Sequence, residues 1–261
     1  MKTKRYLPAL ASALVLLSLA ACSGESAEAD GATPAAGGEE HPASEELTVF
    51  AAASLQEAFD DLLAQFGEEH PEVAIAPAIY DGSSTLVTQL EEGAEADVLA
   101  TANEPTMEDA VAAGVLTTDP ELFATNELVI AVRADNPHSI SDLPDVLELD
   151  YAICAVQVPC GDATAQLFEA AGLAADPISE EQNVTAVANR VSAGDVDAGF
   201  IYSTDVAVRP ELLGVSPKAA QIINNYPIGA TSDSRIGAEF VEFVLSEQGR
   251  SVLESYGFGQ P

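Results

Sequence analysis

Basic side chains are scarce in this sequence: 9 Lys and Arg stand against 43 Asp and Glu, which gives a net charge of −34 over 261 residues. A chain this acidic lacks the positive surface that nucleic acids and anionic membranes attract, which argues against both as partners. The charge also opposes the approach of a small anion. A high-salt habitat, in which charge is screened and acidic surfaces aid solubility, is one explanation of the composition.

Histidine and cysteine are scarce as well. The chain has 3 His, and His70 and His138 each adjoin a Pro in an expected loop, where neither resembles a general base. No Ser lies in a G-x-S-x-G motif, so a hydrolase is a distant alternative and no enzymatic activity is expected. The 3 Cys are Cys22, Cys154 and Cys160. Two thiols without a nearby His supply too few ligands for a metal site, and no cofactor is expected.

Only the N-terminus carries a long apolar run. Three basic residues precede an apolar segment over 7–21, which ends in Leu-Ala-Ala and is followed by Cys22. This pattern is typical of a secretory signal and is too short for a retained membrane helix. A Cys directly after Leu-Ala-Ala resembles the bacterial lipobox, in which that Cys becomes the lipidated N-terminus. We therefore predict a lipoprotein signal peptide at 1–21 and an exported protein, anchored by lipid to the outer face of the cytoplasmic membrane; the alternative is a cytosolic protein with an apolar first helix.

Two further features are predicted for the exported chain, a tether after the signal peptide and a disulfide. Residues 22–45 are rich in small and acidic side chains and contain no large apolar residue, so they are predicted to form a flexible acidic tether. Cys154 and Cys160 lie six positions apart in an exported chain, which favours a disulfide between them.

Strand and helix patterns alternate from residue 47 onward. Strands are predicted at 47–53, 73–80, 96–102, 128–133, 151–156 and 198–202, and helices at 54–66, 83–92, 107–114, 163–172, 183–194 and 238–258. This alternation predicts an α/β fold with a largely parallel, buried sheet. In such sheets ligands bind at the carboxyl ends of strands, beside the N-termini of helices.

Four strand-to-helix junctions carry the same chemistry. They are AAASL (51–55), DGSSTL (81–86), VPCGDAT (158–164) and EQNVTAV (181–187). Taken alone each is a helix cap, with Ser54 and Glu57 forming a capping box in the first and Asn183 capping the last. Taken together they offer hydroxyls, backbone N–H groups and positive helix ends, which suit an oxyanion. Tyr202, at the end of a strand, adds a phenolic donor.

The ordered set of motifs resembles the molybdate-binding proteins of bacterial ABC importers, which have the type II periplasmic-binding-protein fold. The matching segments are VFAAASL, DGSSTL, GAEADVLATAN, FATNELVIAV, VPCG, DAGFIYSTD, YPIG and SEQGRSVLESYGF. The resemblance implies two lobes, each a mostly parallel sheet flanked by helices. Lobe one is expected at 46–125 and 226–261 and lobe two at 126–225, with a hinge near Thr125 and Asn225.

The resemblance also implies a binding site. Two hydroxyls of lobe one, Ser54 and Ser83, are expected to hold molybdate or tungstate. Lobe two is expected to add the backbone N–H groups of Cys160 and Val184 and the hydroxyl of Tyr202. The implied partners are a membrane permease and its ATPase, and the protein is expected to be a monomer.

The chain departs from the family pattern at Cys160 and at Asp81, where small neutral residues are usual. The first change leaves a backbone donor in place. The second puts a carboxylate beside an anion site. Hydrogen phosphate carries a proton and benefits from such an acceptor, whereas a site of donors alone rejects it, so phosphate and sulfate stay open as alternatives. A cation binder is a further alternative because of the acidity, although no cluster of ligand residues appears at the junctions.

Overall fold

The computed structural model describes residues 45–261, so the predicted signal peptide, Cys22 and almost all of the predicted tether lie outside the described residues. The first part of the described chain alternates short strands with helices, as predicted. Its elements are β1 (Glu46–Leu47), β2 (Val49–Ala52), the 3-10 helix η1 (Ala53–Leu55), α1 (Gln56–Glu69), β3 (Ala74–Ile75), β4 (Ile79–Asp81), α2 (Ser83–Glu91), β5 (Val98–Ala100) and α3 (Glu104–Ala113).

The second part begins with one long strand and continues the alternation. Its elements are β6 (Glu121–Arg133), the 3-10 helix η2 (Leu143–Val146), β7 (Tyr151–Cys154), α4 (Pro159–Ala171), β8 (Ser179–Glu181), α5 (Val184–Ala193), β9 (Ala198–Tyr202), α6 (Ser203–Ala207), β10 (Leu212–Val215), β11 (Ile223–Ala230), α7 (Arg235–Leu245) and α8 (Glu247–Ser255).

The strands of residues 45–261 form one large sheet and a small two-stranded one. The large sheet has the order β4-β2-β5-β11-β6-β9-β7-β8, with β10 also paired to β6, while β1 pairs with β3. The pairs β2–β4, β2–β5, β7–β8 and β7–β9 are parallel, as predicted, and the other four pairs of this sheet are antiparallel. The long strands β6 and β11 make every antiparallel pair of this sheet.

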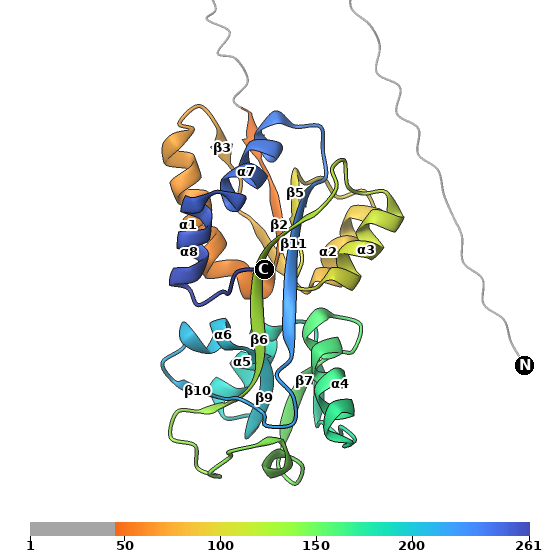
Figure 1. The fold of residues 1–261 in the computed structure, drawn as a ribbon, viewed down its shortest axis with the longest axis vertical. Helices are drawn as coiled ribbons and strands as arrows, with labels where there is room; N and C mark the ends of the chain where they lie inside the picture. Colours follow the sequence, from red (N-terminus) through yellow and green to blue (C-terminus); the bar gives the residue numbers. More distant parts are fainter. Residues whose placement is uncertain (1–44) are drawn as a thin grey trace, which may run out of the picture. The chain divides into compact units, whose positions relative to one another are not determined.

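Strands β6 and β11 connect two groups of elements. We call the elements around β2 and β5 the β2 group and those around β7 and β9 the β9 group; Figure 1 shows them at opposite ends of β6 and β11. Strand β6 pairs with β11 over Glu121–Glu127 and with β9 over Leu128–Val132. Thr125 and Asn225, where the sequence predicts the chain to change lobes, are direct register partners. The lobe boundaries themselves stay a prediction.

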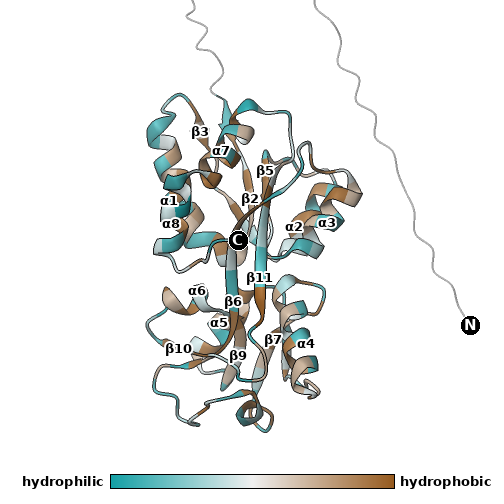
Figure 2. Ribbon diagram, viewed as in Figure 1, coloured by the Kyte–Doolittle hydropathy of each residue, from teal (hydrophilic) through white to brown (hydrophobic). Residues whose placement is uncertain are grey.

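Strands β6 and β11 cross from the β2 group to the β9 group near Thr125 and Asn225. This crossing is polar and is paired with the C-terminal end of the chain. Figure 2 shows hydrophilic residues in the middle of β6 and β11, between more apolar segments. Gly259 forms an antiparallel bridge with Thr125, in which each backbone N–H donates to the other residue's carbonyl oxygen. The last residues of the chain therefore add a third backbone segment to the crossing.

Apolar side chains fill the space between the sheet and the helices. In α1 the buried residues follow helical spacing, at Ala58, Phe59, Leu62, Leu63 and Phe66. Phe66 packs edge-on against Phe240 of α7, with ring centroids 5.3 Å apart. In the β9 group, Phe168 of α4 packs against Phe200 of β9 at 5.4 Å. These contacts hold the helices, and therefore their N-termini, in fixed positions at the strand ends.

Several predicted elements differ in the structure. The helix expected at 163–172 begins at Pro159, because Pro suits the first turn of a helix, and the strand expected at 47–53 is divided into β1 and β2. The strand expected at 73–80 is two short strands, β3 and β4, because Pro77 between them cannot donate a ladder hydrogen bond. The helix expected at 238–258 is two helices, because the extended backbone of Ser246 ends α7 and its hydroxyl accepts the N–H of Gly249 to cap α8. The strand expected at 128–133 begins at Glu121, because pairing with β11 extends it.

Candidate anion-binding site

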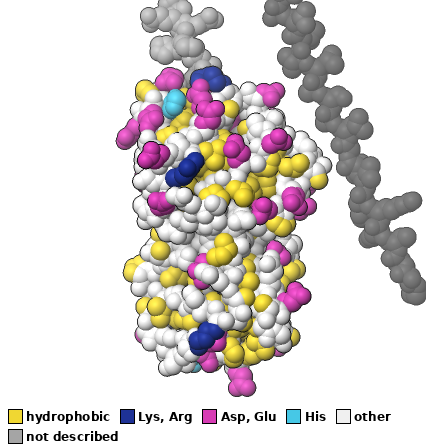
Figure 3. All heavy atoms as spheres, viewed as in Figure 1, with side chains coloured by type: hydrophobic (Ala, Val, Ile, Leu, Met, Phe, Trp, Pro, Cys, Tyr) yellow, Lys and Arg dark blue, Asp and Glu magenta, His cyan; other side chains and the backbone are white. Residues whose placement is uncertain are grey.

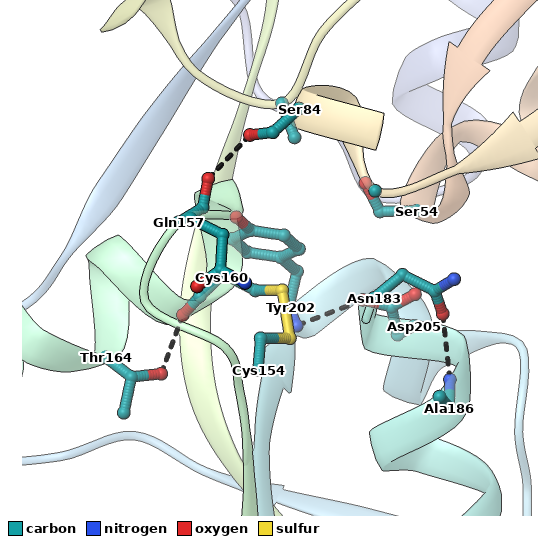
Figure 4. Close-up of a disulfide and its surroundings, with 12 residues drawn as sticks. Ser54, Ser84, Cys154, Gln157, Cys160, Thr164, Asn183, Ala186, Tyr202 and Asp205 are labelled. Carbon is teal, nitrogen blue, oxygen red and sulfur yellow. Dashed lines mark hydrogen bonds between the residues drawn. A yellow bond between two sulfur atoms is a disulfide. The ribbon is translucent and has the colours of Figure 1, made fainter. Parts of the chain in front are cut away.

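One pocket brings together all five residues predicted to hold the ligand. It encloses about 210 Å³ of empty space, including the part open to solvent, and is lined by Ala52, Ala53, Ser54, Asp81, Gly82, Ser83, Ala102, Pro159, Cys160, Asn183, Val184 and Tyr202. The first seven belong to the β2 group and the last five to the β9 group, so the pocket lies between the two groups. Figure 4 shows Ser54 on one side and Tyr202, Cys160 and Asn183 on the other.

Ser54 lies in η1, just after β2, and does not cap a helix. Helix α1 begins at Gln56 without a side-chain cap, so the capping box predicted with Glu57 is wrong. The hydroxyl of Ser54 instead lies 2.9 Å from that of Tyr226, in a buried pair. Tyr226 Oη also accepts from Asn126 Nδ2 at 3.3 Å. When Tyr226 donates its hydrogen to Ser54, the Ser54 hydrogen is free for a ligand.

Ser83 is the first residue of α2 and is almost fully buried, with 1% of its surface exposed. Its Oγ accepts the backbone N–H of Ala102 at 3.0 Å. This contact uses the oxygen as an acceptor and leaves the hydroxyl hydrogen available. Ser83 can therefore donate to an anion in the pocket.

Two helix N-termini of the β9 group line the pocket. Pro159 and Cys160 are the first two residues of α4, and Val184 is the first residue of α5. Pro159 has no N–H, whereas the N–H groups of Cys160 and Val184 have no partner within their own helices. The helix dipole makes both groups favourable to negative charge. Asn183 caps α5 as predicted, because its Oδ1 accepts the N–H of Ala186 at 3.0 Å.

Tyr202 ends β9 and is fully enclosed, with 1% of its surface exposed. Its Oη accepts from Nδ2 of Asn224 at 2.9 Å, and the same amide donates to the carbonyl of Ala102 at 2.8 Å. Burial, followed by the nearby Tyr226 and Asp205, raises the pKa of the Tyr202 phenol well above its usual range. The phenol therefore stays protonated and can serve as a donor.

Sequence reasoning missed three residues that orient these donors. Tyr226, Asn126 and Asn224 are buried on β11 and β6, and their side chains hold the hydroxyls of Ser54 and Tyr202. The signal was present as Asn residues inside strands, where polar side chains are buried only with hydrogen-bond partners. The identity of those partners depends on strand pairing between residues far apart in the sequence.

The pocket wall carries a single formal charge, that of Asp81. None of the Lys and Arg residues in the described range lines the pocket. The half-buried Asp81 directs Oδ1 to the N–H of Gly82 at 2.7 Å and to Nδ2 of Asn183 at 2.8 Å. Figure 3 shows acidic side chains spread over the visible surface, with few basic ones. The groups of the pocket wall that can donate hydrogen bonds are therefore all neutral.

Asp205 is buried behind the site, with 4% of its surface exposed. Burial raises the pKa of its carboxyl to about 7, against the opposing effects of the Tyr202 N–H, which donates to Oδ2 at 3.0 Å, and of Arg209. The carboxyl, which accepts the backbone N–H of Tyr202, therefore changes charge near neutral pH.

A disulfide joins Cys154 to Cys160, whose Cα atoms are 5.6 Å apart. It links the end of β7 to the first turn of α4, beside the pocket (Figure 4). The same turn is held by Thr164, whose hydroxyl donates to the Cys160 carbonyl at 2.7 Å. The backbone N–H of Cys160 therefore lies on a segment that is fixed covalently.

Residues 45–261 hold neither a metal-binding cluster nor a helix that could span a membrane. This part of the chain contains no group of three or more His, Cys, Asp or Glu side chains that could hold a metal ion. It also contains no helix with the length and apolar character needed to cross a membrane.

Comparisons with known proteins agree with the fold. Residues 47–259 match the family described as bacterial extracellular solute-binding protein. The molybdate-binding protein ModA of Mycobacterium tuberculosis H37Rv is 38% identical over 259 residues, covering 97% of each chain. The putative ABC transporter substrate-binding lipoprotein YvgL of Bacillus subtilis is 27% identical, covering 81% of this chain and 85% of its own.

Among solved structures, the periplasmic molybdate-binding protein of Azotobacter vinelandii has the same fold, with a TM-score of 0.69 and 18% identity over 82% of this chain and 99% of its own. The predicted α/β periplasmic-binding-protein fold is thereby confirmed. The family model and the relative at 38% identity together establish that this chain belongs to the bacterial extracellular solute-binding proteins, a family of binding proteins rather than enzymes, alongside proteins named molybdate-binding protein ModA.

Proposed function

We propose that this protein is the molybdate-binding component of an ABC importer, with tungstate as a second ligand. The observation that carries the proposal is the pocket in which the hydroxyls of Ser54, Ser83 and Tyr202 meet the backbone N–H groups of Cys160 and Val184. The high identity to a molybdate-binding protein over 97% of both chains supports the same ligand.

The donors match a fully ionised tetrahedral dianion. Each of the three hydroxyls has its oxygen near a protein hydrogen-bond partner, which leaves a hydrogen for the ligand. The two backbone groups lie at helix N-termini, which favour negative charge without requiring a basic side chain. An anion held in this way is protected from the acidic surface, because short-range dipoles act inside the pocket while surface charges are screened by salt.

The pocket is less suited to hydrogen phosphate. A protonated anion needs an acceptor, and the only carboxylate in the lining is that of Asp81. Oδ1 of this carboxylate already accepts two N–H groups. The other groups that are proposed to hold the ligand are donors, so we expect the site to favour anions without a proton. The similarity to molybdate-binding relatives favours molybdate over sulfate.

The location and the partners follow from the N-terminus and the family. A leader over residues 1–21 that is followed by Cys22 matches a lipid anchor, and the Bacillus relative is described as a lipoprotein. We propose that the exported protein is anchored through Cys22, binds its anion as a monomer, and delivers it to a permease that is driven by an ATPase.

Thermal unfolding of the exported chain, residues 22–261, tests the ligand. Molybdate, tungstate, sulfate and phosphate are each added at millimolar concentration, with sodium chloride at matched ionic strength to control for charge screening. A ligand present at about a thousand times its Kd adds about 4 kcal/mol to the free energy of unfolding, which is a shift of many degrees. A large shift with molybdate and tungstate alone supports the proposal. A shift with phosphate alone, or with none of the four, overturns it.

A further inference from the structure

The start of α2 contacts the starts of both α4 and α5 across the pocket. Asp81 Oδ1 accepts Nδ2 of Asn183 at 2.8 Å, and Ser84 Oγ donates to the carbonyl of Gln157 at 2.6 Å (Figure 4 shows the second contact). Gly82 lies so close to the β9 group that a Cβ there would be 2.5 Å from the carbonyl oxygen of Gln182. These contacts join the two groups of elements directly beside the ligand pocket.

We infer that Asp81 is a positioning residue, which with Asn183 forms a latch that holds the two groups together around the bound anion. The inference rests on the proposed function. It gives a role to the one residue of the pocket wall whose charge works against an anion.

The latch is connected to a ligand donor through a single side chain. Asn183 uses Oδ1 to cap α5, by accepting the N–H of Ala186, and uses Nδ2 to reach Asp81. The next residue is Val184, which begins α5 and lines the pocket. Closing the latch therefore fixes the N-terminus of α5 in both directions, toward its own helix and toward the β2 group.

The Asp81 side of the latch is equally constrained. Oδ1 also accepts the N–H of Gly82, so the carboxylate is held at the turn that precedes Ser83. Ser83 in turn is held by Ala102. The latch thus joins two donor-bearing turns, one from each group, and its formation brings their donors to the same anion.

Replacement of Asp81 distinguishes a latch from simple charge repulsion, because the two explanations predict opposite changes in the molybdate affinity of Asp81→Ala. Asp81→Ala removes the charge and the acceptor, whereas Asp81→Asn removes the charge and keeps an acceptor oxygen for Gly82 and Asn183. If repulsion alone operated, both variants would bind molybdate more tightly, and to the same extent. With a latch, Asp81→Ala binds about tenfold more weakly than the native chain, and Asp81→Asn binds more tightly than the native chain.

Isothermal titration of the exported chain with molybdate measures these affinities. Stopped-flow tyrosine fluorescence gives the release rate, since the chain has no Trp and Tyr202 lines the pocket. Loss of the latch is expected to speed release rather than slow binding. Thr88→Ala, on the exposed face of α2, is the matched control and is expected to bind as the native chain does. Equal affinities of Asp81→Ala and Asp81→Asn within twofold would overturn the inference.

Exchange of the two partners gives a second, independent test. Asn183→Asp keeps a good helix cap but places two carboxylates opposite each other, so binding weakens. Adding Asp81→Asn restores a donor and an acceptor. The double variant should recover affinity by more than the factor that Asp81→Asn gives alone; recovery by that factor or less would contradict the latch.

The latch can be tested even if the proposed ligand is wrong. If the native chain binds none of the four oxyanions, the proposed function fails, and small-angle X-ray scattering of the free proteins then decides. Asp81→Ala should have a larger radius of gyration than Asp81→Asn, because its two groups are no longer held together. Identical radii in that case would reject the latch.

Discussion

Ser83→Ala is the most direct test of the site, because the structure separates its effect on stability from its effect on binding. The hydroxyl is buried, accepts one backbone N–H from Ala102 and has one hydrogen left for the ligand. Its removal leaves a buried N–H without that acceptor, which costs about 1–2 kcal/mol of the free energy of unfolding. It also removes one donor from a bound dianion, which costs about 1.5–3 kcal/mol of the binding free energy.

The second figure corresponds to a rise in the molybdate Kd of about 10- to 150-fold. Isothermal titration at fixed salt measures the Kd, and urea unfolding without ligand measures the stability loss separately. Thr88→Ala removes a hydroxyl from the same helix, where it bonds only to the carbonyl of Ser84, and is expected to change neither Kd nor selectivity. A Ser83→Ala protein that is less stable but binds molybdate with an unchanged Kd would refute the donor role of Ser83.

Three further predictions concern the residues around the pocket. Tyr202→Phe should raise the molybdate Kd about three- to tenfold in the same titration, since one neutral donor among five is lost; an unchanged Kd would mean that the hydroxyl does not reach the ligand. Asp205→Asn should remove a pH dependence of the free energy of unfolding. The native carboxyl keeps its proton up to about pH 7 in the folded state but only to about pH 4 when unfolded, so native stability falls with rising pH over this window, by up to ~4 kcal/mol relative to the variant. Urea unfolding at pH 4 and pH 7 measures this difference, and a pH-independent difference would contradict it. Cys154→Ser with Cys160→Ser should lower the free energy of unfolding by about 2 kcal/mol, the value for a short closed loop; two free thiols in the unreduced native protein would exclude the bond.

Local sequence patterns were sufficient for the parts of the site that depend on neighbouring residues. Asn183 is a strong N-cap, so α5 begins directly after it, as the sequence indicates. Helix α4 begins at Pro159, four residues before the predicted start at 163, because the backbone of Pro suits the first turn of a helix. Their N-termini carry the expected donors for that reason. The resemblance then placed Ser54 and Ser83 opposite them, and the pocket contains all of these residues.

Contacts between distant residues could not be predicted in the same way. Ser54 reads as a helix cap because Glu57 follows it at the correct spacing, but its partner is Tyr226, 172 positions away. The pairing exists because β11 runs back through the sheet between β5 and β6. Likewise, Asp81 reads as a departure that weakens an anion site, and its contact with Asn183 appears only when the two groups are folded against each other.

The pairing of Thr125 with Asn225 has a consequence for how the chain could be divided. Because these two residues are register partners on adjacent strands, the segment between them leaves and re-enters the β2 group at one place. Such a segment has the geometry of an inserted cassette, whose two ends could be joined by a tight hairpin without moving the flanking strands. The β2 group would then be a continuous chain in its own right, and the β9 group could be exchanged for that of a relative, carrying the helix N-termini of α4 and α5 into a new pocket.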